Sequence, residues 1–249
     1  MGIKNSIKKR YNWLVNVKFD KKTGFYKYSQ FEKYIYIRHP RHFLDFKSVK
    51  WLCENIYYHY YFPKNNDVVV DLGAGYGEET VYLYDKSPDI NFYGIEIQPI
   101  IFECLSNTMH GLKGNFKSSS MAIGHDENLF LSSQFSYSSV GDIPENGYID
   151  VPCIKWPDFL KKYNIRSIDL LKMNIEGGEK SLLESISDFS IIKRLVLSCH
   201  DFRANDGDGE FYRTKECVIN ILKKNNYNIK TFSTGKSWGD DWIYAEQNT

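Results

Sequence analysis

The spacing of hydrophobic residues changes in a regular way along most of the chain. Short apolar runs rich in β-branched residues, typical of buried parallel strands, alternate with segments whose apolar residues recur at helical spacing. This alternation indicates an α/β fold in which helices cover both faces of a mostly parallel sheet. The runs predict strands over 67–72, 91–97, 117–123, 168–173 and 192–199. The segments between and after them predict helices over 78–85, 99–109, 156–163, 179–186 and 210–225.

Two further features complete the predicted domain. Residues 227–232 and 242–245 have the pattern of strands around a glycine-containing turn at 235–239, which predicts one antiparallel edge on the sheet. Residues 126–146 are rich in serine and glycine, and we expect a hairpin or a mobile insert there, with 148–154 pairing to it.

The beginning of the chain has a different pattern. It is rich in aromatic side chains, and residues 45–59 place apolar residues at the spacing of an amphipathic helix. Pro63 and the polar residues after it then interrupt the pattern. We therefore expect an N-terminal cap segment over residues 1–62 and a single compact α/β domain over residues 63–249.

Composition narrows the class of protein. Of 249 residues, 42% are hydrophobic and 25% charged, which is typical of a soluble globular protein. The net charge of +1 argues against nucleic acid as a partner. Five scattered cysteines without CxxC spacing, and no signal peptide, indicate a reducing compartment. No apolar run approaches the length of a membrane-spanning helix, so we expect a cytoplasmic protein without membrane insertion.

The strongest chemical signal is the run Asp71-Leu72-Gly73-Ala74-Gly75-Tyr76-Gly77, directly after the first predicted strand of the domain. Glu96 ends the next strand, where a carboxylate accepts hydrogen bonds from ribose hydroxyls. A dinucleotide site would need a third glycine where the chain has Glu78, and an acidic helix start repels pyrophosphate. S-adenosylmethionine carries a sulfonium and an ammonium and suits acidic neighbours. A glycine-rich turn without any ligand is the remaining alternative.

A wider pattern supports that cofactor. It comprises the glycine run, Ile95-Glu96-Ile97-Gln98-Pro99, Ala122-Ile123-Gly124 and the stretch from Ile168 to Glu179, which ends Ile175-Glu176-Gly177-Gly178-Glu179. With a histidine after the fifth strand, in Cys199-His200, this pattern resembles the FkbM-type class I S-adenosylmethionine-dependent methyltransferases over roughly residues 34–199. The resemblance implies a Rossmann-like, seven-stranded sheet and O-methylation, often of sugars or natural-product hydroxyls. The chain departs from the family at Asn174, where an aspartate is usual.

The expected cofactor contacts follow from the glycine run, the strand ends and the resemblance. They are Asp71, Gly73, Ala74, Gly75, Tyr76, Glu79, Thr80, Glu96, Ile97, Met121, Ala122 and Asn174.

The expected catalytic residues follow the fourth and fifth strands, whose carboxyl ends face the same ligand. They are Asn174 and Glu176 after the fourth strand and His200 and Asp201 after the fifth. In one hypothesis His200 is the general base, Glu176 orients the substrate or His200, and Asn174 contacts the methionine end of the cofactor. In the other, these four residues hold a divalent ion, Mg²⁺ or Mn²⁺, that polarises the acceptor hydroxyl.

These observations favour a bacterial O-methyltransferase that acts on a sugar, either a nucleotide-linked sugar or an intermediate of capsule or lipopolysaccharide synthesis. Residues 174–177 lack the Asn/Asp-Pro-Pro-aromatic motif of base amino-methyltransferases, which is a second argument against a nucleic-acid substrate. Two alternatives remain: a methyltransferase for a small non-sugar hydroxyl or amino substrate, and a non-catalytic cofactor-binding subunit of a glycan assembly complex. Each of these three functions is compatible with a homo-oligomer.

Overall fold

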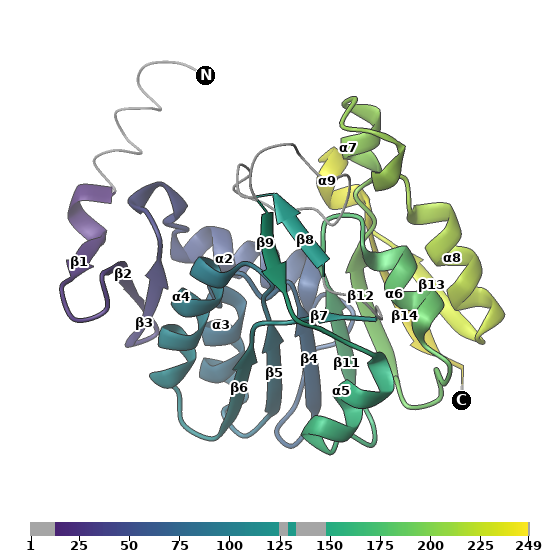
Figure 1. Cartoon of the computed structure of the whole chain (residues 1–249), viewed down its shortest axis with the longest axis horizontal. Helices are drawn as coiled ribbons and strands as arrows, with labels where there is room; N and C mark the ends of the chain where they lie inside the picture. The colour runs from purple at the N-terminus through teal and green to yellow at the C-terminus, as the bar shows by residue number, and fades with distance from the viewer. Residues whose placement is uncertain (1–12, 125–128, 133–147, 249) are drawn as a thin grey trace.

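The structure is a computed structural model, and it describes residues 13–124, 129–132 and 148–248. Its centre is a twisted seven-stranded sheet with helices on both faces (Figure 1). The strand order is β13-β14-β12-β11-β4-β5-β6. In chain order the strands are β4 (Val68–Leu72), β5 (Asn91–Ile95), β6 (Asn115–Ser119), β11 (Leu170–Met173), β12 (Arg194–Ser198), β13 (Tyr227–Thr231) and β14 (Trp242–Gln247).

Strands β4, β5, β6, β11 and β12 are parallel, whereas β14 is antiparallel to both β12 and β13. The chain therefore reaches the sheet edge in β13 and returns in β14, one place further in. The predicted mostly parallel sheet with an antiparallel edge pair is confirmed.

The helices largely match the sequence pattern. Pro99 begins its helix as predicted. The predicted helix 210–225 begins at Lys215 instead, because Asp201 accepts hydrogen bonds from the backbone of Thr214 and Lys215 and so caps it there. The polar run before it contains a short helix that the sequence did not predict. The helices are α3 (Glu78–Lys86), α4 (Pro99–His110), α5 (Trp156–Tyr163), α6 (Glu179–Ser185), α7 (Asp201–Asn205), α8 (Lys215–Lys224), α9 (Ser237–Asp240) and the 3₁₀ turn Glu210–Tyr212.

The predicted strand 117–123 is divided in two. The backbone N–H groups of Ala122 and Gly124 donate to Pro152 and Ile154, so this stretch finds its partners outside the central sheet. There β7 (Ala122–Ile123) pairs in parallel with β10 (Cys153–Ile154). As expected, 148–154 also contributes to a hairpin, in which β9 (Tyr148–Val151) pairs antiparallel with β8 (Leu129–Ser132). Most of the predicted insert 126–146 lies outside the described residues, which in this part of the chain are 129–132.

A small antiparallel sheet precedes the domain, and the sequence pattern did not reveal it. It consists of β1 (Lys18–Asp20), β2 (Phe25–Gln30) and β3 (Lys33–Ile37). Its buried side chains Tyr28, Ile35 and Ile37 pack with Val81 of α3, and Figure 1 shows β3 beside α4. A 3₁₀ turn (Pro40–His42), helix α2 (Phe46–Leu52) and a π-helical turn (Cys53–Tyr57) then follow. The last two occupy the predicted helix 45–59.

Alternate residues of each central strand supply two separate cores. Val70, Leu171 and Leu195 face one side of the sheet, where Leu182, Leu183 and Val218 of α6 and α8 cover them. Val69, Leu170 and Val196 face the other side, together with apolar residues of α2, α3 and α4. This two-faced burial explains why the strands are apolar throughout. Within the described residues, no helix has the length and apolar character needed to cross a membrane.

Candidate cofactor and active site

A cavity of about 410 Å³ opens at the carboxyl ends of the central strands. Leu72 of β4, Ile95 of β5 and Asn174 after β11 all line it. This is the edge at which open α/β sheets bind ligands, and the volume is in the usual range for a small-molecule site.

The glycine run forms the floor of the cavity, and Gly73 is the position that needs glycine most. It has φ +80°, and a Cβ built there would lie 2.1 Å from the backbone oxygen of Asn174. The loop after β4 therefore packs directly on the backbone that leaves β11. Gly75 also has a left-handed φ, of +56°, and its Cβ position is open space on the cavity wall. A ligand can approach the backbone closely at this point.

Glu96, which the sequence predicts to bind the ribose, lies on the cavity wall. Its two carboxylate oxygens accept hydrogen bonds from the backbone N–H groups of Gly75 (3.1 Å) and Gln98 (2.9 Å). Burial raises the pKa of Glu96 to about 7, against the opposing effect of those hydrogen bonds. Its carboxylate is thus held rigidly on the cavity wall.

A buried ion cluster supports the opposite wall. Lys172 of β11 lies 2.7 Å from Asp71 Oδ1 and 2.8 Å from Glu79 Oε1, with its Nζ 4.9 Å from the centre of the Tyr57 ring. Burial alone would lower the pKa of Lys172, but the two carboxylates raise it. One ammonium faces two carboxylates, and Asp71 Oδ2 has no hydrogen-bond partner within the described residues. Sequence reasoning assigned Lys172 no role, because nothing in the pattern indicates that this charged residue is buried.

Glu78 is a further acidic group that sequence reasoning did not assign to the site. It lines the cavity, and its carboxylate accepts a hydrogen bond of 3.2 Å from the hydroxyl of Tyr28. Burial raises the pKa of Glu78 to about 7, and the neighbouring Glu79 acts in the same direction. Its position at the first residue of α3 was visible in sequence, but the contact from β2 was not.

The cavity wall contains most of the predicted cofactor contacts. Three of them, Asp71, Ala74 and Thr80, do not line the cavity, because their side chains are fully buried. Asp71 forms an ion pair with Lys172 instead. The predicted contacts that line the cavity are Gly73, Gly75, Tyr76, Glu79, Glu96, Ile97, Met121, Ala122 and Asn174.

These groups fit S-adenosylmethionine. Glu78, Glu79, Glu96 and Glu176 all line the cavity, and the start of α3 presents carboxylates where a phosphate would need donors. A cationic ligand is favoured in such a site, whereas a dinucleotide pyrophosphate would be repelled. The apolar wall near Met121 and Ile97 suits a purine ring.

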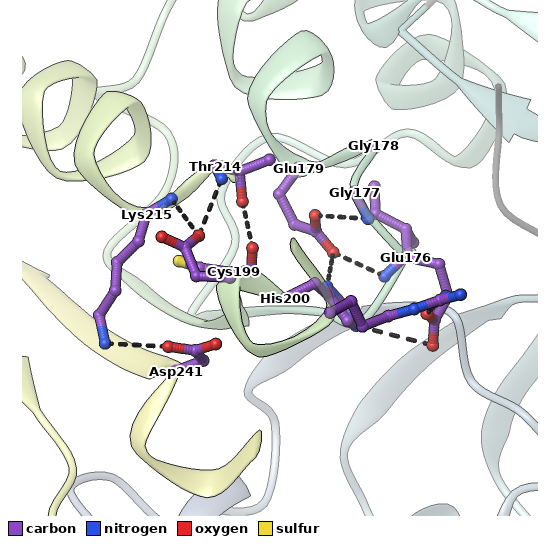
Figure 2. Close-up of polar contacts among 12 residues, drawn as sticks. Glu176, Gly177, Gly178, Glu179, Cys199, His200, Thr214, Lys215 and Asp241 are labelled. Carbon is purple, nitrogen blue, oxygen red and sulfur yellow. Dashed lines mark hydrogen bonds and ion pairs between the residues drawn. The ribbon is translucent and has the colours of Figure 1, made fainter. Parts of the chain in front are cut away.

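The loop after β11 is fixed by one fully buried carboxylate (Figure 2). Glu179 accepts hydrogen bonds from the backbone N–H groups of Ile175 (2.9 Å) and Gly177 (3.0 Å). His200, at the end of β12, lies between Glu179 and Glu176, with Nδ1 3.2 Å from Glu179 Oε1 and Nε2 3.6 Å from Glu176 Oε1. Arg203 pairs with the other oxygen of Glu176 at 2.7 Å.

This arrangement changes the role predicted for His200. Burial lowers the pKa of its imidazole, but the two carboxylates outweigh burial and raise the pKa to about 10. At neutral pH the ring is therefore protonated and has no lone pair with which to accept a proton. His200 is also buried and does not line the cavity, whereas Glu176 does. This geometry favours a positioning role for His200 over the predicted role of general base.

Asp201 is not brought to the cavity. Its carboxylate accepts hydrogen bonds of 2.9 Å from the backbone N–H groups of both Thr214 and Lys215 and caps α8. The four predicted ligands of a divalent ion therefore do not converge, since Asp201 caps a helix and Glu176 is paired with cations. Over residues 13–124, 129–132 and 148–248, no group of three or more His, Cys, Asp or Glu side chains is arranged to hold a metal ion.

The N-terminal segment closes the cavity from the other side. Phe43, Leu44, Val49 and Leu52 add an apolar wall, next to Arg41 and His42. Residues of the N-terminal segment thus contribute directly to the cavity wall.

His42 joins this segment to the glycine run. Its Nδ1 makes a short hydrogen bond with the hydroxyl of Tyr76, and its Nε2 accepts from Arg41 Nε at 3.0 Å. Burial, followed by the positive charges of Arg41, His39 and Arg38, lowers the pKa of His42 to about 4, so the ring is neutral. Because the guanidinium can only donate, Nδ1 carries the proton and donates to Tyr76.

Comparison with known proteins decides the family. The model of the methyltransferase FkbM domain matches residues 71–229, which is more than half of the chain. The chain belongs to the FkbM methyltransferase family. Enzymes of this family take a methyl group from S-adenosylmethionine, in agreement with the cofactor predicted from the glycine run and the acidic wall.

Other similarities are more distant. The METTL16 methyltransferase domain superposes with a TM-score of 0.51 at 12% identity, covering 96% of this chain and 89% of that one, and shares its fold. Aeropyrum pernix fibrillarin with bound S-adenosyl-L-methionine gives a TM-score of 0.42 at 16% identity, over 73% and 67% of the two chains. A tRNA (guanine-N(7)-)-methyltransferase of Aliivibrio salmonicida (strain LFI1238) is 44% identical over 46 residues, which span 18% of this chain and 19% of that protein.

Proposed function

We propose that this FkbM methyltransferase transfers the methyl group of S-adenosylmethionine to a hydroxyl oxygen of a sugar. The observation that carries the proposal is the acidic cavity behind the glycine run, with Glu96 fixed on its wall by the Gly75 N–H and Glu79 held by Lys172. The sugar acceptor rests on the family resemblance and on the apolar and aromatic wall that the N-terminal segment adds, since such faces suit sugar rings.

The bound cofactor would supply an electrophilic methyl carbon, and the protein must place the acceptor oxygen behind it. Glu96 and the backbone at Gly75 would hold the nucleoside end of the cofactor, and Glu79 and the loop at Asn174 would border its methionine end, since all of them line the cavity. Glu179 and His200 keep that loop in its left-handed turn, where Glu176 has φ +54°. Positioning by rigid neighbours is the main contribution that these residues make.

A sugar hydroxyl must also lose its proton. Of the four carboxylates on the cavity wall, Glu79 and Glu96 are assigned to the cofactor, which leaves Glu78 and Glu176 for this role. Burial raises the pKa of Glu176, but His200 and Arg203 outweigh that effect and lower its pKa, so it is a weak base. The pKa of Glu78, about 7, is matched to a proton transfer at neutral pH. We therefore assign Glu78 as the general base and Glu176 as a substrate-orienting residue.

The acceptor that fits this account is a nucleotide-linked sugar or an intermediate of surface-glycan synthesis in the cytoplasm. The test is to incubate the purified chain with S-adenosylmethionine and a panel of nucleotide sugars, and to measure S-adenosylhomocysteine and the methylated product by mass spectrometry. Turnover on sugars that is strongly reduced in Glu78→Gln supports the proposal. Turnover only on phenols or amines would show that the acceptor is not a sugar. Cofactor binding without turnover on any acceptor would favour a non-catalytic subunit.

A further inference from the structure

The chain is strongly polarised in charge, although its net charge is close to zero. Residues 1–50 contain 13 basic residues (Lys and Arg) and 3 acidic residues, a net charge of +10. Residues 51–249 contain 19 basic and 28 acidic residues, a net charge of −9. The basic part includes the small sheet and the turn that closes the cavity, and the acidic part includes the cofactor wall. The cavity therefore lies where two regions of opposite charge meet.

Arg41 brings this positive charge to the cavity itself. It lies on the 3₁₀ turn Pro40–His42 and lines the cavity, while its side chain is exposed. The turn is fixed by His39, whose Nδ1 accepts a hydrogen bond of 3.1 Å from the Arg41 backbone. The rings of His39 and His42 are 6.5 Å apart, so the basic side chains of this turn form one cluster.

The guanidinium of Arg41 is held in a defined orientation. Its Nε donates to Nε2 of the neutral His42, whose other nitrogen binds Tyr76 of the glycine run. The terminal nitrogens form a planar fork that suits the oxygens of a phosphate or carboxylate. No carboxylate of the described residues lies within ion-pair distance of Arg41 or of the neighbouring Arg38. Within the described residues Arg41 thus lines an acidic cavity without an acidic partner of its own, and Arg38 lies three residues before it in the chain.

We propose that Arg41, assisted by Arg38, binds an anionic phosphate group of the acceptor at the mouth of the cavity. The inference rests on the proposed function and narrows its substrate class to phosphate-bearing sugars. The acidic wall repels such a group from the cofactor side, while Arg41 attracts it at the rim, so the sugar is oriented with its hydroxyls toward Glu78 and Glu176. The phosphate has two sources: a nucleotide diphosphate, or a phosphate headgroup at an anionic lipid surface.

The test uses the full chain with S-adenosylhomocysteine present and titrates it with uridine diphosphate, with uridine as the uncharged control. A parallel arm measures co-sedimentation with phosphatidylglycerol vesicles against phosphatidylcholine vesicles. The variants are Arg41→Gln, Arg41→Lys and Arg38→Gln. Lys47→Gln is the matched control, because it removes the same charge from the same basic segment at an exposed site off the cavity wall.

We expect uridine diphosphate to bind and uridine not to bind, with Arg41→Gln weakening the affinity by at least about tenfold. Arg41→Lys should recover part of the loss, Arg38→Gln should show a smaller one, and Lys47→Gln should remain within about twofold. Vesicle binding that is lost in Arg41→Gln but kept in Lys47→Gln would instead identify the lipid surface as the source of the phosphate.

Four results would overturn the proposal. One is normal S-adenosylhomocysteine binding with no affinity for either phosphate probe, which leaves the proposed function intact. Another is an equal loss in Arg41→Gln and Lys47→Gln, which would indicate a diffuse basic surface. In the third, Arg41→Gln weakens S-adenosylhomocysteine itself, and Arg41 then binds the carboxylate of the cofactor. The fourth comes from a titration of the same chain with tRNA: tight binding without affinity for uridine diphosphate would assign the basic segment to nucleic acid. Absence of S-adenosylhomocysteine binding by the wild type would instead contradict the proposed function.

Discussion

Nδ1 of His200 lies 3.2 Å from Oε1 of Glu179, and that fully buried carboxylate also accepts two backbone hydrogen bonds from the loop after β11. The end of β12 is therefore joined electrostatically to the loop that carries Asn174 and Glu176. Removal of the imidazole would leave a buried carboxylate without its cation. His200 thus shapes the cavity wall from behind and does not need to touch the acceptor.

We expect His200→Gln to lower the free energy of unfolding by about 3 kcal/mol, because it breaks a buried ion pair. The pKa of His200 is about 10 in the folded protein, against an ordinary value of 6.5 for a histidine. The stabilisation is thus complete below the unfolded pKa and is lost as pH rises toward the folded one. Urea unfolding at about pH 6, 8 and 9.5 should show that the difference in free energy of unfolding between the wild type and His200→Gln becomes smaller as the pH rises. Exposed His110→Gln is the control, and a pH-independent difference would contradict the assignment.

The buried cation at Lys172 gives a second prediction. Lys172→Met should destabilise the fold by about 4 kcal/mol, since Asp71 and Glu79 would then face each other without a cation. Adding Asp71→Asn to this variant should recover part of the loss, because one of the two uncompensated charges disappears. Denaturant unfolding of the single and double variants measures this coupling. Additive effects of the two substitutions would show that the cluster does not act as a unit.

The close approach at Gly73 can be tested with a matched glycine. Gly73→Ala should lower the free energy of unfolding by about 3 kcal/mol. The added Cβ would lie 2.1 Å from the backbone oxygen of Asn174, and the alanine would have to adopt φ +80°. Gly24→Ala has a similar φ of +76° but open space around the Cβ, so it should cost only about 1 kcal/mol. Thermal and denaturant unfolding compare the two. Equal costs would mean that backbone conformation alone selects glycine at position 73.

The assignment of Glu78 predicts a pH dependence of turnover. With both substrates saturating, kcat should rise with pH and level off above about 7, because only the ionised carboxylate accepts the proton. Glu78→Gln should reduce kcat by about 100-fold and abolish this limb, with affinity for S-adenosylhomocysteine nearly unchanged. Tyr28→Phe removes a hydrogen bond that stabilises the charged form, so the limb should move to higher pH. A limb that persists in Glu78→Gln would identify another base.

The sequence predicted the parts of this molecule that depend on local pattern. Parallel strands buried on both faces are apolar throughout, and the glycine run at Gly73 and Gly75 follows from backbone conformations that few other residues adopt. The position of Glu96 after the next strand follows from the same βαβ unit. These features are visible without any knowledge of distant contacts.

The parts it missed depend on contacts between distant segments. The roles of His200 and Asp201 are decided by Glu179 and by the start of α8, and residue type alone does not show either contact. The small sheet β1-β2-β3 has short strands rich in lysine and tyrosine, so its alternation is weak. Arg41 reaches the cavity only because this sheet packs against α3 and α4.

The central claim is that the acidic cavity binds S-adenosylmethionine, and calorimetric titration with S-adenosylhomocysteine tests it most directly. We expect a dissociation constant on the order of micromolar for the wild type, binding at least about tenfold weaker for Glu96→Gln, and no change for Lys47→Gln. Absence of binding by a wild-type protein that unfolds cooperatively, or equal binding by Glu96→Gln, would contradict the account.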